Sequence, residues 1–218
     1  MTTSAGMTDV PSVTFKRRSR ERTHSAMRER ILDGTVTLLS ERPAQRLTMR
    51  EVANHVGIAR ATLYRYYRTV EELFAGVGDH RRARFKSDIR AAVEGLVDPI
   101  DIFLALLRFL RVYNDAQMTD RFLEAEPHSV LRNIRAYFRF YVECVEAEMA
   151  PVFDWIEAQI QRPLRRGLAT EIVVRNQFSA ALIPGDGDWA NLDLFVPEVW
   201  TFLFGPAIKP QAAKRLAR

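Results

Sequence analysis

The sequence predicts an all-α protein, and two observations carry this prediction. Side chains recur at helical spacing near the N-terminus, where Met27, Ile31 and Leu38 are four and seven residues apart and share one helix face. No segment shows the sustained alternation of apolar and polar residues that is typical of a strand. The 218 residues, 47% of them hydrophobic, are sufficient for a folded protein of one or two domains.

The first helix is expected to begin near Thr23 and to end before Pro43, because proline disfavours the helical conformation at the residue that precedes it. Residues 1–22 are predicted to form a disordered arm, since their beginning is rich in Thr, Ser and Gly. The arm ends in a basic cluster, Lys16–Arg22, which either folds on nucleic acid or stays a solvated tail.

Two capping boxes predict where the next helices begin. In a capping box the threonine oxygen accepts a backbone N–H of the first turn, and the glutamate reaches back to the N–H of the threonine. Thr48 and Glu51 open a short helix, and Thr69 and Glu72 open a helix that reaches about Val93.

Prolines divide the remainder of the chain into further helices. Asp98 and Pro99 supply an N-cap and a first helical residue. Pro127 starts a long helix, which Pro151 breaks. The helices expected in this part cover residues 99–113, 120–125, 127–150, 151–160, 170–183 and 190–204, with a connector at 162–169.

Two short helices on either side of Gly57 have the spacing of a helix-turn-helix. Glycine adopts at little cost the left-handed backbone that ends a helix. The residues expected to pack between the helices are Val52, Ala53, Val56 and Leu63.

The second helix of this pair, residues 60–66, is the candidate recognition helix. Such a helix enters the major groove of DNA with its N-terminal residues on the base edges, and the guanidinium of Arg60 suits guanine. Hydroxyl groups on the same helix can bind phosphates and fix the register of the protein on DNA.

The charge distribution favours the same partner. The formal net charge is +5, but residues 1–90 carry 18 of the 32 Lys and Arg and only 10 of the 27 Asp and Glu. A basic first part joined to a slightly acidic remainder indicates that the first part meets a polyanion, and nucleic acid is the commonest one. An anionic membrane surface is the competing partner.

The segment 47–74 resembles the helix-turn-helix of the TetR family of one-component transcriptional regulators. The residues that match the family pattern are Thr48, Val52-Ala53, Val56–Ala59, Thr62–Tyr64, Tyr66-Tyr67 and Glu71–Phe74. The resemblance implies a DNA-binding domain at 23–69 with three helices, followed by a larger α-helical domain at 70–218 that binds an effector and dimerises. It also implies a homodimer on a palindromic operator, with 170–183 and 190–204 as the dimerisation helices.

Candidate site residues follow from the motif and the resemblance. The candidate DNA-binding residues are Arg46, Thr48, Arg60, Ala61, Thr62, Tyr64, Arg65, Tyr66 and Tyr67. The candidate effector-binding residues, taken from the aromatic-rich part after residue 98, are Phe103, Leu107, Phe138 and Tyr141. An aromatic lining favours an apolar or aromatic effector.

Two departures from the family pattern bear on DNA binding. Ala59 stands where the family often has serine, which removes an N-cap oxygen from the recognition helix. Val70 stands where it often has lysine, which removes a phosphate contact. A member that has lost DNA binding is therefore one alternative, although Arg65, Arg68 and the basic cluster can compensate.

The function predicted is that of a cytoplasmic, nucleoid-associated repressor that a small ligand releases from DNA. The alternatives are a nucleoid or division factor without ligand control, an enzyme and a membrane-surface protein. The sequence shows no catalytic, cofactor or metal motif, and its one cysteine, Cys144, is expected to be a buried apolar side chain. No enzyme, cofactor, metal or membrane partner is therefore predicted.

Overall fold

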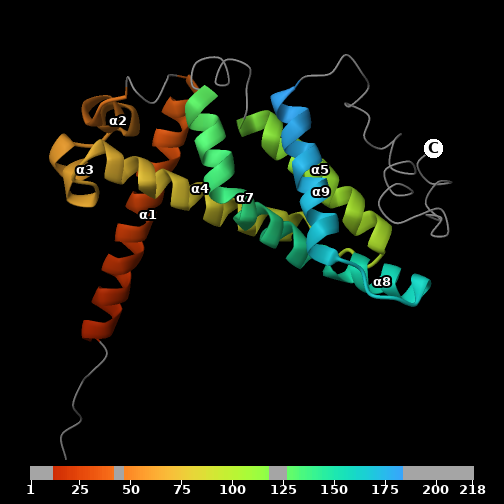
Figure 1. The fold of residues 1–218 in the computed structure, drawn as a ribbon. Helices are drawn as coiled ribbons and strands as arrows, with labels where there is room; N and C mark the ends of the chain where they lie inside the picture. Colours follow the sequence, from red (N-terminus) through yellow and green to blue (C-terminus); the bar gives the residue numbers. More distant parts are fainter. Residues whose placement is uncertain (1–11, 42–46, 118–126, 184–218) are drawn as a thin grey trace, which may run out of the picture. The chain divides into compact units, whose positions relative to one another are not determined.

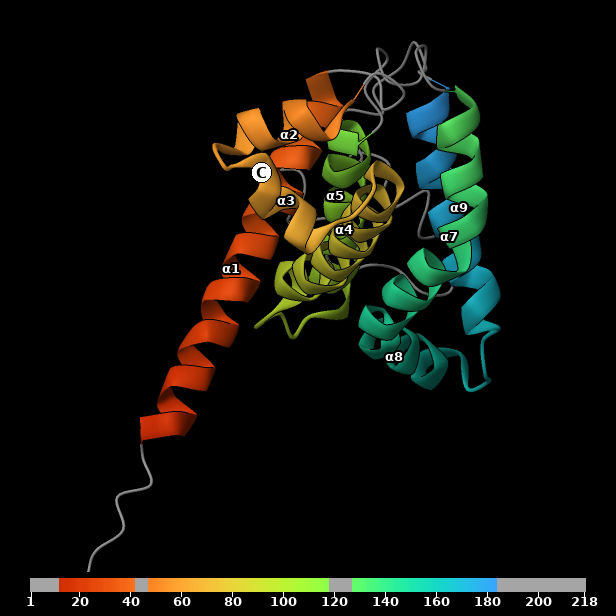
Figure 2. The same ribbon diagram turned by 90° about the vertical axis from the view of Figure 1, so that its left-hand side faces the viewer.

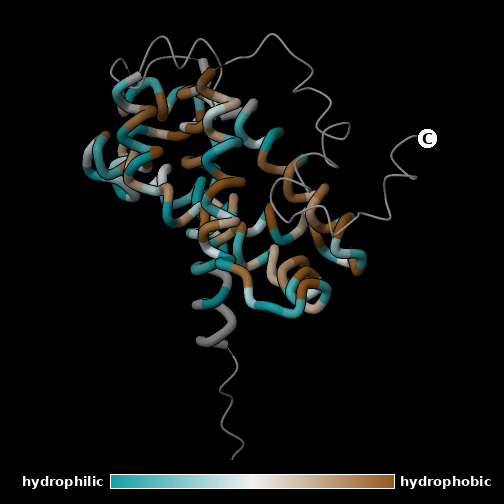
Figure 3. The backbone as a smooth tube through the Cα atoms, turned by 45° about the vertical axis from the view of Figure 1, so that its right-hand side comes forward, coloured by the Kyte–Doolittle hydropathy of each residue, from teal (hydrophilic) through white to brown (hydrophobic). Residues whose placement is uncertain are grey.

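The computed structural model describes residues 12–41, 47–117 and 127–183, and these ranges contain eight α-helices and no strand (Figure 1). The predicted all-α class is confirmed. The chain divides into two compact units, Met1–Arg82 and Ala83–Arg218, and the boundary between them falls within helix α4. Hydrophobic and hydrophilic positions succeed one another along the helices, as expected for helices that are buried on one side (Figure 3).

Unit 1 contains α1 (Ser12–Glu41), α2 (Met49–Val56), α3 (Arg60–Tyr66) and the first half of α4 (Val70–Val93). The four residues predicted to pack between the helices are all buried. They belong to one core, which consists of Ile31, Leu32, Leu38, Leu47, Met49, Val52, Ala53, Val56, Leu63, Tyr67, Leu73 and Val77.

Helix α1 begins at Ser12, eleven residues before the predicted start, and it ends at Glu41 as predicted. The prediction of a disordered arm is therefore wrong for residues 12–22. Arg, Lys and Glu are strong helix formers, and each residue added to an existing helix gains a hydrogen bond without a new nucleation cost. The part of the predicted arm before residue 12 lies outside the described residues.

Two glycines of unit 1 allow close contact between helices. A Cβ atom on Gly34 of α1 would lie 2.7 Å from Cγ2 of Val56 on α2. A Cβ atom on Gly76 of α4 would lie 2.8 Å from Cε1 of Tyr67, at the end of α3. Both contacts are too short for a methyl group, so glycine is required where α1 meets α2 and where α4 meets the aromatic ring.

The first predicted capping box is complete and the second is not. Glu51 N–H donates to Oγ1 of Thr48 at 3.3 Å, and Thr48 N–H donates to Oε2 of Glu51 at 3.0 Å. At α4, Glu72 N–H donates to Oγ1 of Thr69 at 3.1 Å, but the carboxylate of Glu72 accepts from the N–H of Arg68 at 2.7 Å. The Glu72 carboxylate thus binds the backbone of Arg68, the residue before the N-cap, and not the backbone of the N-cap residue Thr69.

Unit 2 contains the second half of α4, α5 (Pro99–Gln117), α7 (Pro127–Glu148), α8 (Ala150–Ile160) and α9 (Arg166–Leu182). Asp98 caps α5 as predicted, with its Oδ1 2.8 Å from the N–H of Ile100. The chain breaks between α7 and α8 at the predicted proline. The helices predicted at 120–125 and 190–204 lie outside the described residues. No described helix has the length and apolar character needed to cross a membrane.

Helix α9 begins four residues earlier than predicted, at Arg166, because this arginine is bound to α8. Its guanidinium donates to Oδ1 of Asp154 at 2.7 Å and to Oε1 of Glu157 at 3.1 Å. Oε1 of Glu157 also accepts the N–H of Leu164 at 2.8 Å. The Arg166 hydrogen bond, followed by the Leu164 N–H, lowers the pKa of Glu157 to about 2. These contacts fix the connector and the start of α9.

Replacing Gly76 with alanine is expected to destabilise unit 1, and Gly78 provides a matched control on the same helix. The Gly76→Ala methyl group meets the ring of Tyr67, which costs roughly 1–3 kcal/mol. The Gly78→Ala methyl group meets only the flexible end of Arg82 at 3.3 Å, so the helix gains up to about 1 kcal/mol. Urea unfolding of both variants measures this difference, and equal stabilities would contradict the close packing of Tyr67.

Candidate nucleic-acid interface

The turn between α2 and α3 is fixed by backbone hydrogen bonds. Gly57 has φ = +71°, the left-handed conformation that was predicted for it. Its N–H donates to the carbonyl of Asn54 at 3.2 Å, and the N–H of Ile58 donates to the carbonyl of Ala53 at 3.0 Å. These bonds satisfy the last carbonyls of α2, so α3 begins three residues later in a defined direction.

Helix α1 holds this turn from the other side. Arg30 of α1 donates from Nη2 to the carbonyl of Val56 at 2.6 Å, at the C-terminus of α2. A cation at that end also interacts favourably with the helix dipole. The pair α2–α3 is therefore anchored to α1 by a charged hydrogen bond as well as by the core.

Helix α3 presents one face to the core and the opposite face to solvent. Leu63 has no exposed surface, and its burial sets the rotation of the helix. Tyr64 is 43% exposed. The exposed candidate residues of this helix are Arg60, Ala61, Tyr64 and Arg65, and Thr62 is half-buried beside them.

The two tyrosines at the end of α3 are held by α1. The ring of Tyr66 is half-buried and stacks on the imidazole of His24, with ring centroids 4.5 Å apart. The hydroxyl of Tyr67 accepts a hydrogen bond from Nε of Arg28 at 3.2 Å, and this bond raises the pKa of Arg28. Both contacts link α3 to residues more than thirty positions earlier in the chain.

Tyr67 therefore corrects the predicted set. Only 4% of this residue is exposed, and its ring packs in the core against Gly76. The ring is not on the exposed face of α3, so Tyr67 supports the interface from behind. The contact with Arg28 could not be predicted from the motif, because the two residues are 39 positions apart in the sequence.

Thr48 is exposed at the N-terminus of α2, but its hydroxyl is already engaged. It donates to Oε2 of Glu51 at 2.8 Å and accepts the N–H of Glu51. The threonine thus orders the first turn of α2. Arg46, the remaining candidate on this side, lies outside the described residues.

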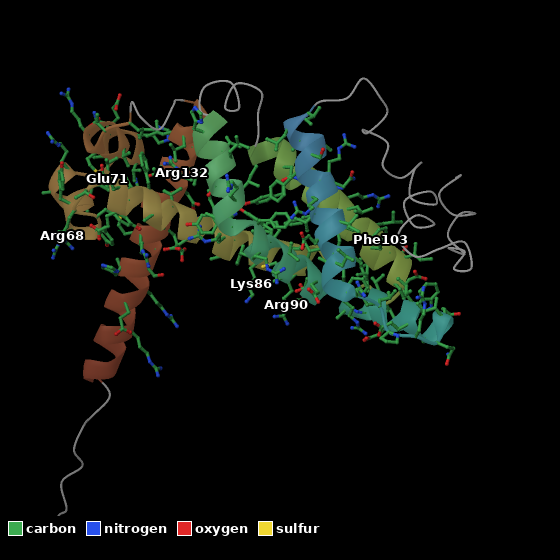
Figure 4. All side chains as sticks on the ribbon, in the orientation of Figure 1. Arg68, Glu71, Lys86, Arg90, Phe103 and Arg132 are labelled. Atoms are coloured by element: carbon green, nitrogen blue, oxygen red, sulfur yellow. The ribbon has the colours of Figure 1, made fainter. Side chains whose placement is uncertain are left out.

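Two further arginines border the exposed face of α3. Arg50 is exposed on the first turn of α2, and Arg68 is exposed just after α3. Figure 4 shows Arg68 pointing away from the helices of unit 1. Arg50 was not among the candidate DNA-binding residues. Its charge and its position near the predicted start of a helix could both be read from the sequence.

The N-terminus of α3 lacks a side-chain cap, as the sequence predicted. Ala59 occupies the N-cap position in an extended conformation and makes no side-chain hydrogen bond. Its carbonyl accepts the N–H of Thr62 at 2.9 Å and that of Leu63 at 3.2 Å, so the helix starts without help from a hydroxyl.

The four candidate effector residues all belong to the packed interior of unit 2. Phe103 and Leu107 lie in the core of α5, with no exposed surface and 3% exposed surface respectively. Tyr141 and Phe138 of α7 meet Phe178 of α9, with centroid distances of 5.6 and 6.2 Å. The structure brings the two α7 residues together around one ring.

The one cysteine of the sequence lies in the core of unit 2. Cys144 is buried as predicted, and desolvation raises the pKa of its thiol. Within the described ranges, no group of three or more His, Cys, Asp or Glu is placed to hold a metal ion.

Helices α1, α2 and α3, with a fixed turn and an exposed basic face on α3, have the arrangement of a helix-turn-helix of the DNA-binding class. Residues 31–77 match the family model of the bacterial regulatory proteins of the tetR family. Residues 31–77 are thus similar to the DNA-binding domain of the TetR family of transcriptional regulators. The resemblance predicted from the sequence is confirmed.

Similar proteins include regulators and a nucleoid factor. The nucleoid occlusion factor SlmA of Haemophilus influenzae (strain PittGG) is 25% identical over 159 residues, which are 70% of this chain and 68% of that protein. The HTH-type transcriptional regulator MT1294 of Mycobacterium tuberculosis is 31% identical over 88 residues, 40% of this chain and 44% of that protein. The crystal structure of the TetR family repressor AlkX from Dietzia sp. strain DQ12-45-1b is 20% identical, with a TM-score of 0.45, over 87% of this chain and 95% of that chain.

Adding a cap to α3 is expected to stabilise unit 1. In Ala59→Ser the new hydroxyl can accept a first-turn N–H of α3, which contributes about 1 kcal/mol. Urea unfolding measures the gain, and Ala61→Ser, an exposed substitution two residues into the helix, is the control that adds a hydroxyl without a cap. Equal unfolding midpoints for the two variants would show that the N-terminus of α3 does not limit stability.

Proposed function

We propose that the protein is a homodimeric, sequence-specific DNA-binding transcriptional regulator, and that it acts as a repressor. The observation that carries this proposal is the exposed basic face of α3, held in place by the buried side chain of Leu63. Arg60, on the first turn of α3, is proposed to contact a base edge in the major groove. Tyr64 and Arg65, on the same face, are proposed to contact base edges or phosphates.

Unit 2 supports the proposed dimer. Leu168 and Ile172 of α9 are four residues apart and 52% and 40% exposed, and Ile183, which follows the helix in an extended conformation, is 70% exposed. Exposed apolar side chains that recur at helical spacing favour association with another helix surface. Two copies of the chain would place two α3 helices on two half-sites, which predicts a palindromic operator.

Unit 2 is also proposed to bind the effector that releases the repressor from DNA. The aromatic cluster around Phe138, Tyr141 and Phe178 supports an apolar or aromatic ligand. Release requires that the ligand bind more tightly to the state that does not fit the operator. Phe103 and Leu107 are proposed to form the base of this site.

A second candidate function rests on the similarity to SlmA, whose name describes a nucleoid occlusion factor. Under this alternative the protein binds sites along the chromosome without ligand control. The DNA-contacting residues would be the same, and the distribution of binding sites would differ.

The test is selection of binding sites from a random duplex library by the full chain at about 150 mM salt. We expect a palindrome whose half-sites are about one helical turn apart. Arg60→Ala should relax the preference at one base position of each half-site and weaken binding by roughly 5- to 150-fold per half-site, because each bidentate arginine contributes about 1–3 kcal/mol of discrimination. Arg162→Ala, an exposed arginine of unit 2, is the matched control.

The selected sequence then separates the two candidates. Sites confined to promoter regions would favour the repressor, and sites distributed along the chromosome would favour the nucleoid factor. No enrichment of any sequence, with equal binding by both variants, would contradict sequence-specific recognition by α3.

A further inference from the structure

The first half of α1 extends beyond the core of unit 1. Residues 18 and 21–26 are exposed, and among the side chains of α1 that the structure describes the first buried one is Ile31. Figures 1 and 2 both show this part of α1 projecting past α2 and α3. Among its described side chains, His24 contacts α3 by stacking on Tyr66.

This projecting part carries the basic cluster. Lys16–Arg22 contains five cationic side chains and one carboxylate. Arg18 and Arg22 are exposed, lie one turn apart and form no ion pair with any described residue. Like charges at this spacing destabilise a helix, and an isolated helix of this length is only marginally stable in water. A bound polyanion would remove the repulsion and stabilise the helix.

The cluster lies beside the recognition helix. His24 of α1 stacks on Tyr66 of α3, which places the two helices in contact at this point. With a rise of about 1.5 Å per residue, Lys16–Arg22 lies about 3–12 Å along the helix axis from the level of His24. A duplex that contacts α3 is therefore within reach of the cluster.

We propose that residues 12–26 of α1 form a second DNA-binding element, which contacts phosphates next to those reached by α3. This inference rests on the proposed function and adds a separate surface to it. Exposed arginines on a projecting helix suit phosphates, which need charge but little fixed geometry. Such contacts contribute affinity equally on all sequences and carry no base preference.

Composition favours DNA over a lipid surface as the occupant. A helix that lies on a membrane needs a continuous apolar face with residues such as Trp, Phe or Leu. Residues 16–25 contain no apolar residue. The remaining residues of the element add two large apolar side chains, Val13 and Phe15, which are two positions apart and therefore do not share one helix face. The element thus has the charge of a membrane-binding helix without a continuous apolar face.

The test compares the salt dependence of DNA binding in charge-neutralised variants of the full chain. Two double variants divide the cluster by helix face: Arg18→Gln with Arg22→Gln, and Arg17→Gln with Arg20→Gln. The control is Lys86→Gln with Arg90→Gln, an exposed pair on α4 that is also one turn apart and removes the same two charges (Figure 4). Glutamine is a good helix former, so circular dichroism should show unchanged helix content.

Each variant is titrated at 50 and 200 mM salt with the selected duplex and with a mixed-sequence duplex of equal length. The slope of log K against log salt is negative. For each bound protomer, loss of two phosphate contacts makes this slope shallower by about two. The ratio of wild-type to variant affinity should then change about tenfold between the two salt concentrations. We expect this change on both duplexes for at least one α1 pair, and none for the α4 control.

Three results would overturn the inference. The first is an unchanged slope for both α1 pairs, and the second is an equal change for the α4 control, which would indicate net charge alone. The third is that an α1 double variant binds vesicles of anionic lipid more weakly than the wild type does, while its DNA binding is unchanged. This result would assign the element to a membrane. Failure of the wild type to bind any duplex would instead contradict the proposed function, so the two failures are distinguishable.

Discussion

A helix of seven residues has no stability of its own in water, so the position of α3 depends entirely on what it packs against. The decisive contact is the burial of Leu63 in the core formed with α1 and α2. A fully buried leucine contributes roughly 1.5–3 kcal/mol relative to an exposed one. This contribution fixes the rotation of α3, and the rotation in turn decides which side chains of the helix are available to a partner.

Other contacts within unit 1 also fix the position of α3. Gly34 lets α1 approach α2 closely, Arg30 holds the C-terminus of α2, and Gly57 sets the direction of the turn. Tyr66 and Tyr67 tie the end of α3 back to α1. The consequence is a fixed α3 with a charged face, next to the projecting first half of α1. A helix held in one orientation, such as α3, suits contacts with the edges of DNA bases. A projecting helix, such as the first half of α1, suits contacts with phosphates.

Much of this arrangement could be predicted from the sequence, because the determinants are local. The capping box at Thr48, the left-handed Gly57 and the missing cap at Ala59 depend on residues within four positions of one another. The core positions of α2 and α3 follow from helical periodicity. Local signals of this kind also predicted the end of α1 at Glu41 and the division between α7 and α8.

The failures involve either distant partners or a competition between weak local effects. Tyr67 was assigned to the DNA face because its core contacts, with Arg28 and Gly76, come from other helices. The start of α9 depends on the pairing of Arg166 with α8, which no periodicity indicates. The beginning of α1 was missed because a segment that starts rich in Thr, Ser and Gly and has little apolar pattern is typical of disorder, yet its later residues extend a helix that is already nucleated. The alternative partner for Glu72 lies only one residue from the predicted one.

Hydrogen–deuterium exchange of the full chain, with and without duplex DNA, tests the central claim most directly, since it locates the interface without any substitution. The account predicts slower exchange in α3 and in residues 12–26 of α1 when the duplex is added, and unchanged exchange in α8. Protection confined to unit 2, or no change in α3 at duplex concentrations that saturate binding, would contradict the claim that the exposed face of α3 is the DNA interface.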